Sequence, residues 1–314
     1  MKILLTGGAG FIGSHVADRL IEGGHDVYIV DDLSNGKIEN LNEEAKFIRA
    51  DIRDRERMEE IFEEVKPEIV NHHAAQISVQ KSVEKPLYDA EVNVLGSLNL
   101  IDLSVKHGVK RFVYISSGGA VYGDPLYLPC DEKHPVNPLS PYGASKHAVE
   151  HYLYLYHVNY GLDYVVLRYS NIFGPRQDPF GEAGVVAIFT VRMLKGQDVH
   201  IFGDGYQERD FLYVRDVAEA NLLAQEADIR LEDPMDPVFN LGTGRGTNVR
   251  EIYQALADIT GYKKAPVFKE RRPGEVYKIS LNAEKAASVL GWRPKTTLID
   301  GMKETVEWFK KRIG

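Results

Sequence analysis

The chain has a single cysteine, Cys130, among its 314 residues. One cysteine cannot form an internal disulfide, which argues against a disulfide-stapled secreted protein and favours a cytoplasmic one. Long hydrophobic runs are also missing, since none approaches the roughly 20 residues that a membrane-spanning helix needs. The start at Met1 runs directly into a predicted strand and lacks the pattern of a signal peptide. We therefore expect neither a secreted nor a membrane protein.

Basic residues are too few to balance the acidic ones. Lys plus Arg number 38 against 46 for Asp plus Glu, giving a formal net charge of −8. This balance argues against nucleic acid as the main partner. Any anionic ligand would have to be held by local positive charges. The hydrophobic fraction of 44% is nevertheless ordinary for a globular chain and sufficient for a packed core.

Short apolar runs alternate with helical patterns through the first half of the chain. The predicted strands are Lys2–Thr6, Asp26–Val30, Lys46–Ala50, Glu68–Asn71, Arg111–Ser116 and Tyr164–Arg168. Parallel neighbours need crossover connections, so this alternation predicts an α/β fold with a doubly wound parallel sheet. Ligands of such a sheet bind at the carboxyl ends of its strands.

Turn residues become frequent after about Gly174, as in Gly203–Gly205 and Gly242–Gly244. This frequency of turn residues predicts a smaller, loop-rich lobe whose loops close over a ligand. We place a first domain at 1–174 and the second lobe mainly at 175–314. Residues of about 212–250 are expected to return to the first domain, because Phe239–Gly242 has the pattern of a further strand of its sheet.

A glycine-rich turn follows the first predicted strand. Gly8-x-Gly10-x-x-Gly13 matches the general dinucleotide fingerprint, and Gly7-x-x-Gly10-x-x-Gly13 matches its shifted short-chain variant. Backbone N–H groups and the helix dipole at such a turn can hold a pyrophosphate. A plain tight turn would have the same glycines, but the strand before it and the helix after it favour a Rossmann-like cofactor site.

Acidic residues follow the second and third predicted strands. Asp31 and Asp32 lie about 20 residues after the turn, where a carboxylate accepts hydrogen bonds from ribose hydroxyls and repels a 2′-phosphate. This position favours NAD over NADP. Either acid could instead cap the turn at Ser34–Gly36. Asp51 could meet the adenine amino group or could simply cap the helix that begins near Asp54.

Tyr142 and Lys146 are four residues apart on a predicted helix and therefore share a face. A free tyrosine, with a pKa of about 10, is a poor base at neutral pH unless a nearby positive charge stabilises its phenolate. The Lys146 ammonium and a positively charged nicotinamide ring would both do so. Such a pair is common by chance, but here it follows Ser116 and Ser117 at a strand end. Together with the glycine turn, it predicts hydride chemistry at a carbinol carbon.

These motifs resemble the extended short-chain dehydrogenase/reductase superfamily, and most of all its UDP-glucose 4-epimerases, also called UDP-galactose 4-epimerases. Further matching segments are His72–Ala75, Asn93, Arg168–Asn171, Ile201–Gly205, Arg209–Phe211, Asn240–Gly242 and Arg272–Glu275. The resemblance implies a tightly held NAD and a UDP-hexose substrate. Tyr142 would remove the proton of the sugar O4 while hydride leaves C4, and the 4-keto sugar would turn over before hydride returns. It also implies a homodimer built on helices near Pro86–His107 and Ala144–Tyr160.

The resemblance also assigns residues to the two halves of the site. The expected NAD contacts are Gly7, Gly10, Phe11, Ile12, Gly13, Asp31, Asp32, Ser34, Asn35, Gly36, Asp51, Ile52, His73, Ala74, Ala75, Gln76, Asn93, Ser116, Tyr142, Lys146, Tyr169 and Ser170. The expected substrate contacts are Gly118, Asn171, Gly184, Val185, Ile201, Phe202, Arg209, Phe211, Arg272, Glu275 and Ile279. Arg209 and Arg272 would pair with the diphosphate, and Ile279 would limit the space near the sugar C2 substituent.

The chain departs from this family at one position. Counting back from Val121, Tyr122 and Gly123, the usual Ser or Thr hydroxyl falls at Gly118. We expect Ser117 to replace it and to complete the catalytic set with Tyr142 and Lys146; a water or backbone N–H groups could do the same. The dehydratase relatives carry an acidic pair where this chain has Gly119 and Ala120, so elimination chemistry is disfavoured.

Other functions stay open at this stage. The chain could epimerise UDP-N-acetylhexosamines or UDP-uronates, could be another nucleotide-sugar short-chain dehydrogenase, or could be a non-catalytic nucleotide sensor on the same frame. A metal site is not expected, because the adjacent His72 and His73 would point to opposite faces of a strand.

Overall fold

The computed structural model describes residues 1–180, 184–229, 237–270 and 276–313. Its main element is a seven-stranded parallel sheet in the order β11-β6-β5-β4-β1-β2-β3. The strands are β1 (Lys2–Thr6), β2 (Asp26–Asp31), β3 (Lys46–Arg49), β4 (Ile69–His72), β5 (Arg111–Ser117), β6 (Asp163–Tyr169) and β11 (Val238–Leu241). The predicted doubly wound sheet is confirmed, with strand ends that differ from the predicted ones by at most one residue.

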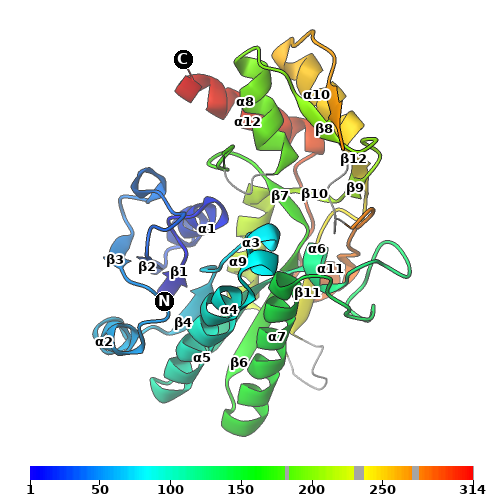
Figure 1. Cartoon of the computed structure of the whole chain (residues 1–314). Coiled ribbons are helices and arrows are strands. Elements are labelled where there is room, and N and C mark those ends of the chain that lie inside the picture. The colour runs from blue at the N-terminus through cyan, green and yellow to red at the C-terminus, as the bar shows by residue number, and fades with distance from the viewer. Residues whose placement is uncertain (181–183, 230–236, 271–275, 314) are drawn as a thin grey trace.

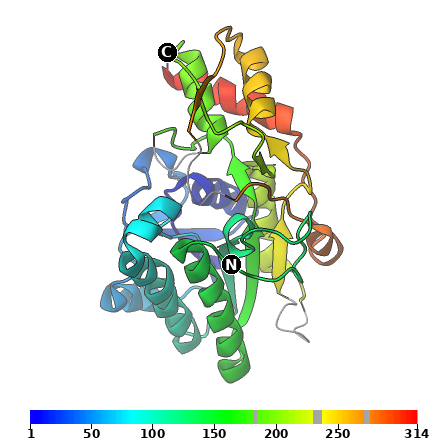
Figure 2. The ribbon, with the colours of Figure 1, turned by 45° about the vertical axis from the view of Figure 1, so that its right-hand side comes forward.

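Two helical layers cover the sheet, because successive side chains of each buried strand point to opposite faces. On one face Ile3 and Leu5 pack with α1 (Phe11–Glu22), α9 (Val214–Glu226) and α11 (Glu284–Val289). On the other face Leu4 packs with α2 (Arg55–Val65), α5 (Gly96–Lys106) and α7 (Pro141–Tyr160). Figures 1 and 2 show α5 and α7 side by side over this second face.

The strand order places a crevice at the centre of the sheet. From β1 the chain builds outward to β2 and β3, and it then crosses to β4 on the other side of β1. Crossovers that leave in opposite directions from neighbouring strands open a crevice at their carboxyl ends, which is where ligands of such sheets bind. The turn after β1 and the segment after β4 meet there.

A smaller lobe stands over these strand ends, at the top of Figure 1. It contains α8 (Val185–Leu194), α10 (Val249–Thr260) and α12 (Leu298–Ile313), and its core includes Phe189 and Met302. Its short strands pair as β8 (His200–Phe202) with β13 (Val267–Lys269), and β9 (Glu208–Arg209) with β12 (Thr247–Asn248). A further pair, β7 (Asn171–Phe173) with β10 (Phe211–Tyr213), connects the lobe to the main sheet.

The chain crosses back to the main sheet after β10. Helix α9 packs on α1, and β11 pairs with β6 in register Val238 to Val166. The expected returning strand is therefore present, whereas the domain limits at 1–174 and 175–314 stay a prediction. Short elements complete the path: η1 (Ile38–Asn40), α3 (Val79–Glu84), α4 (Pro86–Ala90), the π-helical η2 (Glu91–Leu95) and α6 (Gly118–Val121). Within the described ranges, no helix combines the length and the apolar character that crossing a membrane would take.

Candidate active site

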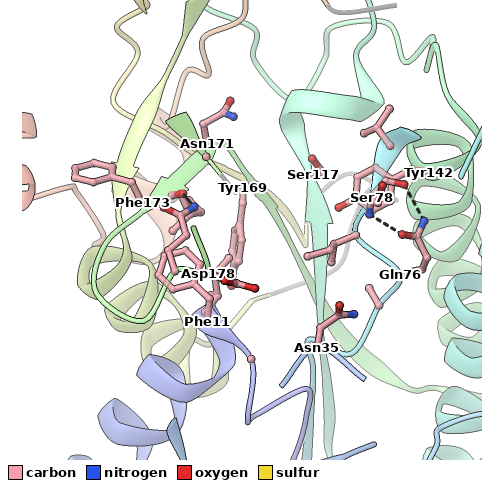
Figure 3. Close-up of a pocket in the computed structure, with 18 of the residues that line it drawn as sticks. Phe11, Asn35, Gln76, Ser78, Ser117, Tyr142, Tyr169, Asn171, Phe173 and Asp178 are labelled. Atoms are coloured by element: carbon pink, nitrogen blue, oxygen red, sulfur yellow. Dashed lines mark hydrogen bonds between the residues drawn. The ribbon is translucent and has the colours of Figure 1, made fainter. Parts of the chain in front are cut away.

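A cavity of about 1170 Å³ lies at the carboxyl ends of the sheet strands, between the sheet and the smaller lobe. The glycine turn, the segment after β4 and the start of α7 line one part of it; β7, α8 and β8 line the other. Figure 3 shows Phe11, Asn35, Gln76, Ser117, Tyr142 and Asn171 around this space. Residues far apart in the sequence are thus brought to one site.

The glycine turn is shaped by close backbone approaches. Gly7 has a φ of +72°, and its N–H donates to Val30 O at 2.8 Å. A Cβ on Gly13 would meet Gly7 O at 2.2 Å, so only glycine fits there. Helix α1 begins after Gly10, which offers no side-chain acceptor to the first-turn N–H groups. The turn thereby presents backbone donors and the positive end of a helix dipole to an anion.

The acids at the end of β2 serve the local turn and line the cavity as well. Asp31 accepts hydrogen bonds from the N–H groups of Ala9 at 3.0 Å and Leu33 at 2.9 Å, and Asp32 accepts one from Ser34 at 2.8 Å. Burial raises the pKa of Asp31, while these backbone N–H groups oppose the rise. Both readings of these acids, turn cap and ligand contact, are therefore compatible with their positions.

Asp51 lines the cavity but does not cap the next helix. Its carboxylate is held by Arg53, with Nη2 to Oδ2 at 2.6 Å, and this hydrogen bond holds the pKa of Asp51 below its usual range. The cap of α2 is Asp54, which accepts from Arg57 N at 3.0 Å. The residue that caps α2 is therefore Asp54, and not Asp51.

Helix α7 carries Tyr142 and Lys146 into the cavity. Ser140 caps it by accepting from Gly143 N, and Pro141 occupies the first helical position, where its missing N–H costs nothing. The Lys146 ammonium donates to Ile115 O at 2.8 Å and lies 5.0 Å from the centroid of the Tyr114 ring. These contacts hold the Lys146 ammonium against β5.

Burial acts on the ionisation of both groups. It raises the pKa of Tyr142 to about 12, against the lowering effect of a hydrogen bond with Ser117. It lowers the pKa of Lys146 to about 8, against the opposing effects of the Asp89 and Glu150 carboxylates. At neutral pH the ammonium is retained, and Tyr142 needs further positive charge before it can act as a base.

Ser117 and Gly118 are placed differently from each other. Ser117 lines the cavity, and its side chain lowers the pKa of the Tyr142 phenol against the larger effect of burial. Gly118 does not line the cavity, and a Cβ there would meet Leu281 Cδ1 at 2.5 Å. The expectation that Gly118 contacts substrate is therefore not supported by its position, because its Cα faces a buried leucine.

Two other expected contacts also lie behind the cavity wall. Asn93 accepts from Gln76 N at 2.8 Å and donates to Gln76 O at 2.9 Å, so it holds a lining residue without lining the cavity itself. Ile279 is 3% exposed and packs with Tyr122 and Leu281. Arg272 and Glu275 lie outside the described residues.

The remaining expected contacts all line the cavity. On the cofactor side they are Gly7, Gly10, Phe11, Ile12, Gly13, Asp31, Asp32, Ser34, Asn35, Gly36, Asp51, Ile52, His73, Ala74, Ala75, Gln76, Ser116, Tyr142, Lys146, Tyr169 and Ser170. On the substrate side they are Asn171, Gly184, Val185, Ile201, Phe202, Arg209 and Phe211. The hydroxyl of Ser170 is buried without a hydrogen-bond partner in the described structure, as expected for a group that faces a ligand.

Several lining residues were not predicted from the sequence. They include the cationic side chains Lys37, Arg53, Lys81, Arg176, Arg192 and Lys195. They place positive charge along the cavity, although Arg53, Arg176 and Lys37 are each paired with a carboxylate. They come from separate loops and helices with no common spacing, so no sequence pattern identifies them. The segment Arg176–Phe180 also lines the cavity.

No group of three or more His, Cys, Asp or Glu side chains that could hold a metal ion occurs in the described part of the chain. His72 is buried, with its ring nitrogens 2.7 Å from Thr6 Oγ1 and 2.9 Å from Ser97 Oγ, whereas His73 lines the cavity. The two adjacent histidines therefore lie in different environments, His72 in the interior and His73 at the cavity.

This sheet, glycine turn and tyrosine-lysine helix define a dinucleotide-dependent enzyme that acts on a hydroxyl group, of the short-chain dehydrogenase type. Comparison with known proteins narrows the class. The chain belongs to the NAD-dependent epimerase/dehydratase family, whose model matches residues 3–242.

Its relatives are similar over essentially the whole chain. A UDP-glucose 4-epimerase of Mycolicibacterium smegmatis is 44% identical over 319 residues, covering 99% of both chains. The crystal structure of a UDP-glucose 4-epimerase of Thermotoga maritima with UDP-glucose is 53% identical, covers 100% of both chains and has a TM-score of 0.97. A Thermus thermophilus UDP-glucose 4-epimerase in complex with NAD is 45% identical, covers 99% of both chains and has a TM-score of 0.91.

Proposed function

We propose that this protein is a UDP-glucose 4-epimerase that interconverts UDP-galactose and UDP-glucose with a tightly bound NAD. The observation that carries the proposal is the placement of Tyr142, Lys146 and Ser117 in the same cavity as the glycine turn. The similarity to UDP-glucose 4-epimerases along the whole chain supports the substrate.

The residues present fit NAD. The turn from Gly7 to Gly13 would hold the pyrophosphate on backbone N–H groups, and Asp31 and Asp32 would accept hydrogen bonds from the adenosine ribose. The close approach at Gly13 and the unpartnered Ser170 hydroxyl are features of this chain that favour such a ligand. When bound, NAD takes a hydride from a carbinol carbon and gives it back, which is the redox chemistry that inversion of that carbon requires.

Side chains of the protein would transfer the proton. Tyr142 would accept the proton of the sugar O4 hydroxyl and later return it, and Ser117 would hydrogen-bond to the same oxygen. Lys146 would stabilise the phenolate by its charge, because its pKa of about 8 leaves it protonated at neutral pH. Arg209, together with Arg272, would hold the diphosphate, which bidentate guanidinium groups bind well.

The test is to mix the purified protein with UDP-galactose, with no NAD added, and to follow UDP-glucose. We expect conversion without net NADH. Tyr142→Phe should abolish most of it, whereas Tyr152→Phe, on the exposed side of the same helix, should not. If the protein converts a UDP-N-acetylhexosamine or a UDP-uronate but not UDP-galactose, the proposed substrate is wrong and the proposed mechanism still holds. Release of stoichiometric NADH would instead indicate a dehydrogenase.

Two further properties are proposed with this function. A homodimer through the helices near Pro86–His107 and Ala144–Tyr160, which are α4, η2, α5 and α7, is supported by exposed apolar side chains there, with Leu87 79% exposed and Val158 59% exposed. Leu87→Lys should then yield monomers in sedimentation analysis, while Leu126→Lys in a separate loop should not. A cytoplasmic location is supported by the single cysteine, which leaves no internal disulfide.

A further inference from the structure

We infer that Asp89 is a positioning residue for the Tyr142 and Lys146 pair: a buried carboxylate that anchors the helix between them and sets the charge around them. The inference concerns the same site as the proposed function, and its catalytic consequence rests on that function. Asp89 belongs to no motif of the sequence and does not line the cavity.

Asp89 connects three separate elements. It is fully buried on the short helix α4 and accepts from Ser145 Oγ at 2.6 Å, Gln76 Nε2 at 2.8 Å and Asn93 Nδ2 at 3.1 Å. Ser145 is on α7, directly before Lys146 in the chain, and Gln76 belongs to the segment after β4 that lines the cavity. One carboxylate thus ties the tyrosine-lysine helix to the cavity wall.

None of these three partners carries a charge. A buried carboxylate among neutral donors keeps its electrostatic influence on its surroundings, because nothing in direct contact neutralises it. That influence acts on both members of the pair. Asp89 raises the pKa of Lys146 against the larger lowering effect of burial, and it adds to the burial that raises the pKa of Tyr142.

The other titratable groups facing the pair differ from Asp89. Glu150, on α7, also raises the pKa of Lys146, but it is paired with the buried Arg168 of β6 at 2.6 Å and 3.0 Å. His72, the last residue of β4, and His73, which follows it, are neutral at neutral pH because burial lowers their pKa. Tyr114, on β5, is neutral because burial raises its pKa. Asp89 is therefore the carboxylate near the pair whose charge has no ion-pair partner within the described residues.

Two consequences follow. The Asp89 charge keeps the buried Lys146 side chain an ammonium, so the charge that Tyr142 needs is present before substrate binds. The hydrogen bond to Ser145 holds the first turns of α7 in register with the cavity wall. The first consequence depends on charge and the second on geometry, so two substitutions separate them: Asp89→Asn removes the charge, and Ser145→Ala removes the hydrogen bond.

The direct test is the titration of Lys146 by NMR in protein labelled with ¹³C at the lysine ε-carbon, with Lys146→Met to assign the resonance. We expect a midpoint near 8 in the unsubstituted protein, lower by about one pH unit in Asp89→Asn, in line with the shift that one nearby charge causes. Asp89→Ser is the second neutral variant if Asp89→Asn does not fold. Asp216→Asn, at a buried carboxylate that accepts from Thr296, is the matched control and should leave the midpoint unchanged.

Turnover supplies the second readout. Asp89→Asn should lower kcat about tenfold and move the alkaline limb of its pH profile downward, with KM changed less than about twofold. Ser145→Ala should lower kcat with both limbs in place, whereas Ser104→Ala, which removes another buried serine hydroxyl, should not lower it. An unchanged Lys146 midpoint in both neutral variants would overturn the charge role, and full activity of Ser145→Ala would overturn the anchoring role. Because the titration needs no substrate, inactivity of the unsubstituted protein towards UDP-galactose would refute the proposed function alone.

Discussion

Ser117 and Gly118 adjoin in the chain but face different surroundings: the Ser117 hydroxyl meets the Tyr142 phenol, and the Cα of Gly118 faces Leu281. Counting along the sequence places the family's usual hydroxyl at Gly118. The structure has no room for it there, since a Cβ would come within 2.5 Å of a fully buried leucine side chain. The proposed role of Ser117 therefore has a geometric basis that counting could not provide.

We predict that substitution of Ser117 lowers activity, whereas substitution of Gly118 lowers stability. Ser117→Ala should lower kcat about 10²-fold or more by removing a hydrogen-bond donor to the reacting oxygen, with little change in stability. Gly118→Ser should cost about 1–3 kcal/mol of unfolding free energy through overpacking and should not rescue Ser117→Ala. Steady-state kinetics and urea unfolding would measure the two effects. Normal turnover of Ser117→Ala would transfer the donor role to water or backbone.

The glycine turn offers a graded test of cofactor binding. A Cβ at Gly10 would approach Gly7 O to 3.2 Å, and one at Gly13 to 2.2 Å. Gly13→Ala should therefore yield protein that is largely free of NAD, because the helix start must move away from the pyrophosphate position, whereas Gly10→Ala should retain most of it. The measurement is the NAD released from purified protein on denaturation. Equal NAD content in both variants would contradict the proposed cradle.

The carboxylates after β2 should control the choice of cofactor. Asp32→Asn keeps an acceptor for the Ser34 N–H and removes a charge that would repel a 2′-phosphate. We expect the affinity for NAD to fall about tenfold. The ratio of the affinities for NAD and NADP should fall by more than about tenfold. Reconstitution of NAD-stripped protein with each dinucleotide, followed by calorimetry, would measure this. Glu43→Gln, at an acid that does not line the cavity, is the control.

Beneath the site, substitutions in the buried pair of Glu150 and Arg168 should have the largest effects on the free energy of unfolding. Arg168 donates to Glu150 at 3.0 Å and 2.6 Å and to the Tyr122 hydroxyl at 2.9 Å. Arg168→Met leaves the buried Glu150 carboxylate without its arginine, with His147 Nδ1 beside it at 3.1 Å, and we expect a loss of about 3–5 kcal/mol in unfolding free energy. The double variant Glu150→Gln with Arg168→Met leaves no unpaired charge and should lose less. A double variant less stable than the single one would contradict this account.

The same pair predicts how stability depends on pH. Burial by itself would raise the pKa of Glu150, but the Arg168 charge and hydrogen bonds outweigh it and hold the pKa well below its usual range. A group whose folded pKa is depressed contributes fully above its unfolded value, about 4.3, and loses that contribution as pH falls through the folded value. Urea unfolding between pH 7 and pH 3 should therefore show a loss below about pH 4 that is smaller in the double variant.

The amino-acid sequence was sufficient for those features that depend on local spacing. The alternation of apolar runs with helical patterns predicted the parallel sheet, because each strand of such a sheet needs its own crossover. The glycine spacing predicted the turn after β1, and the interval of four residues placed Tyr142 and Lys146 on one face of α7. These are properties of a few consecutive residues, and the structure retains them.

Tertiary structure alone decided which side chains face the cavity and which support it from behind. Asn93 and Ile279 match family positions, yet one holds Gln76 and the other is packed against Tyr122. Asp89 belongs to no motif, and it reaches Ser145 across 56 residues of sequence. The physical reason is that burial and long-range hydrogen bonds depend on how separate elements pack, and spacing along the chain carries no record of that packing.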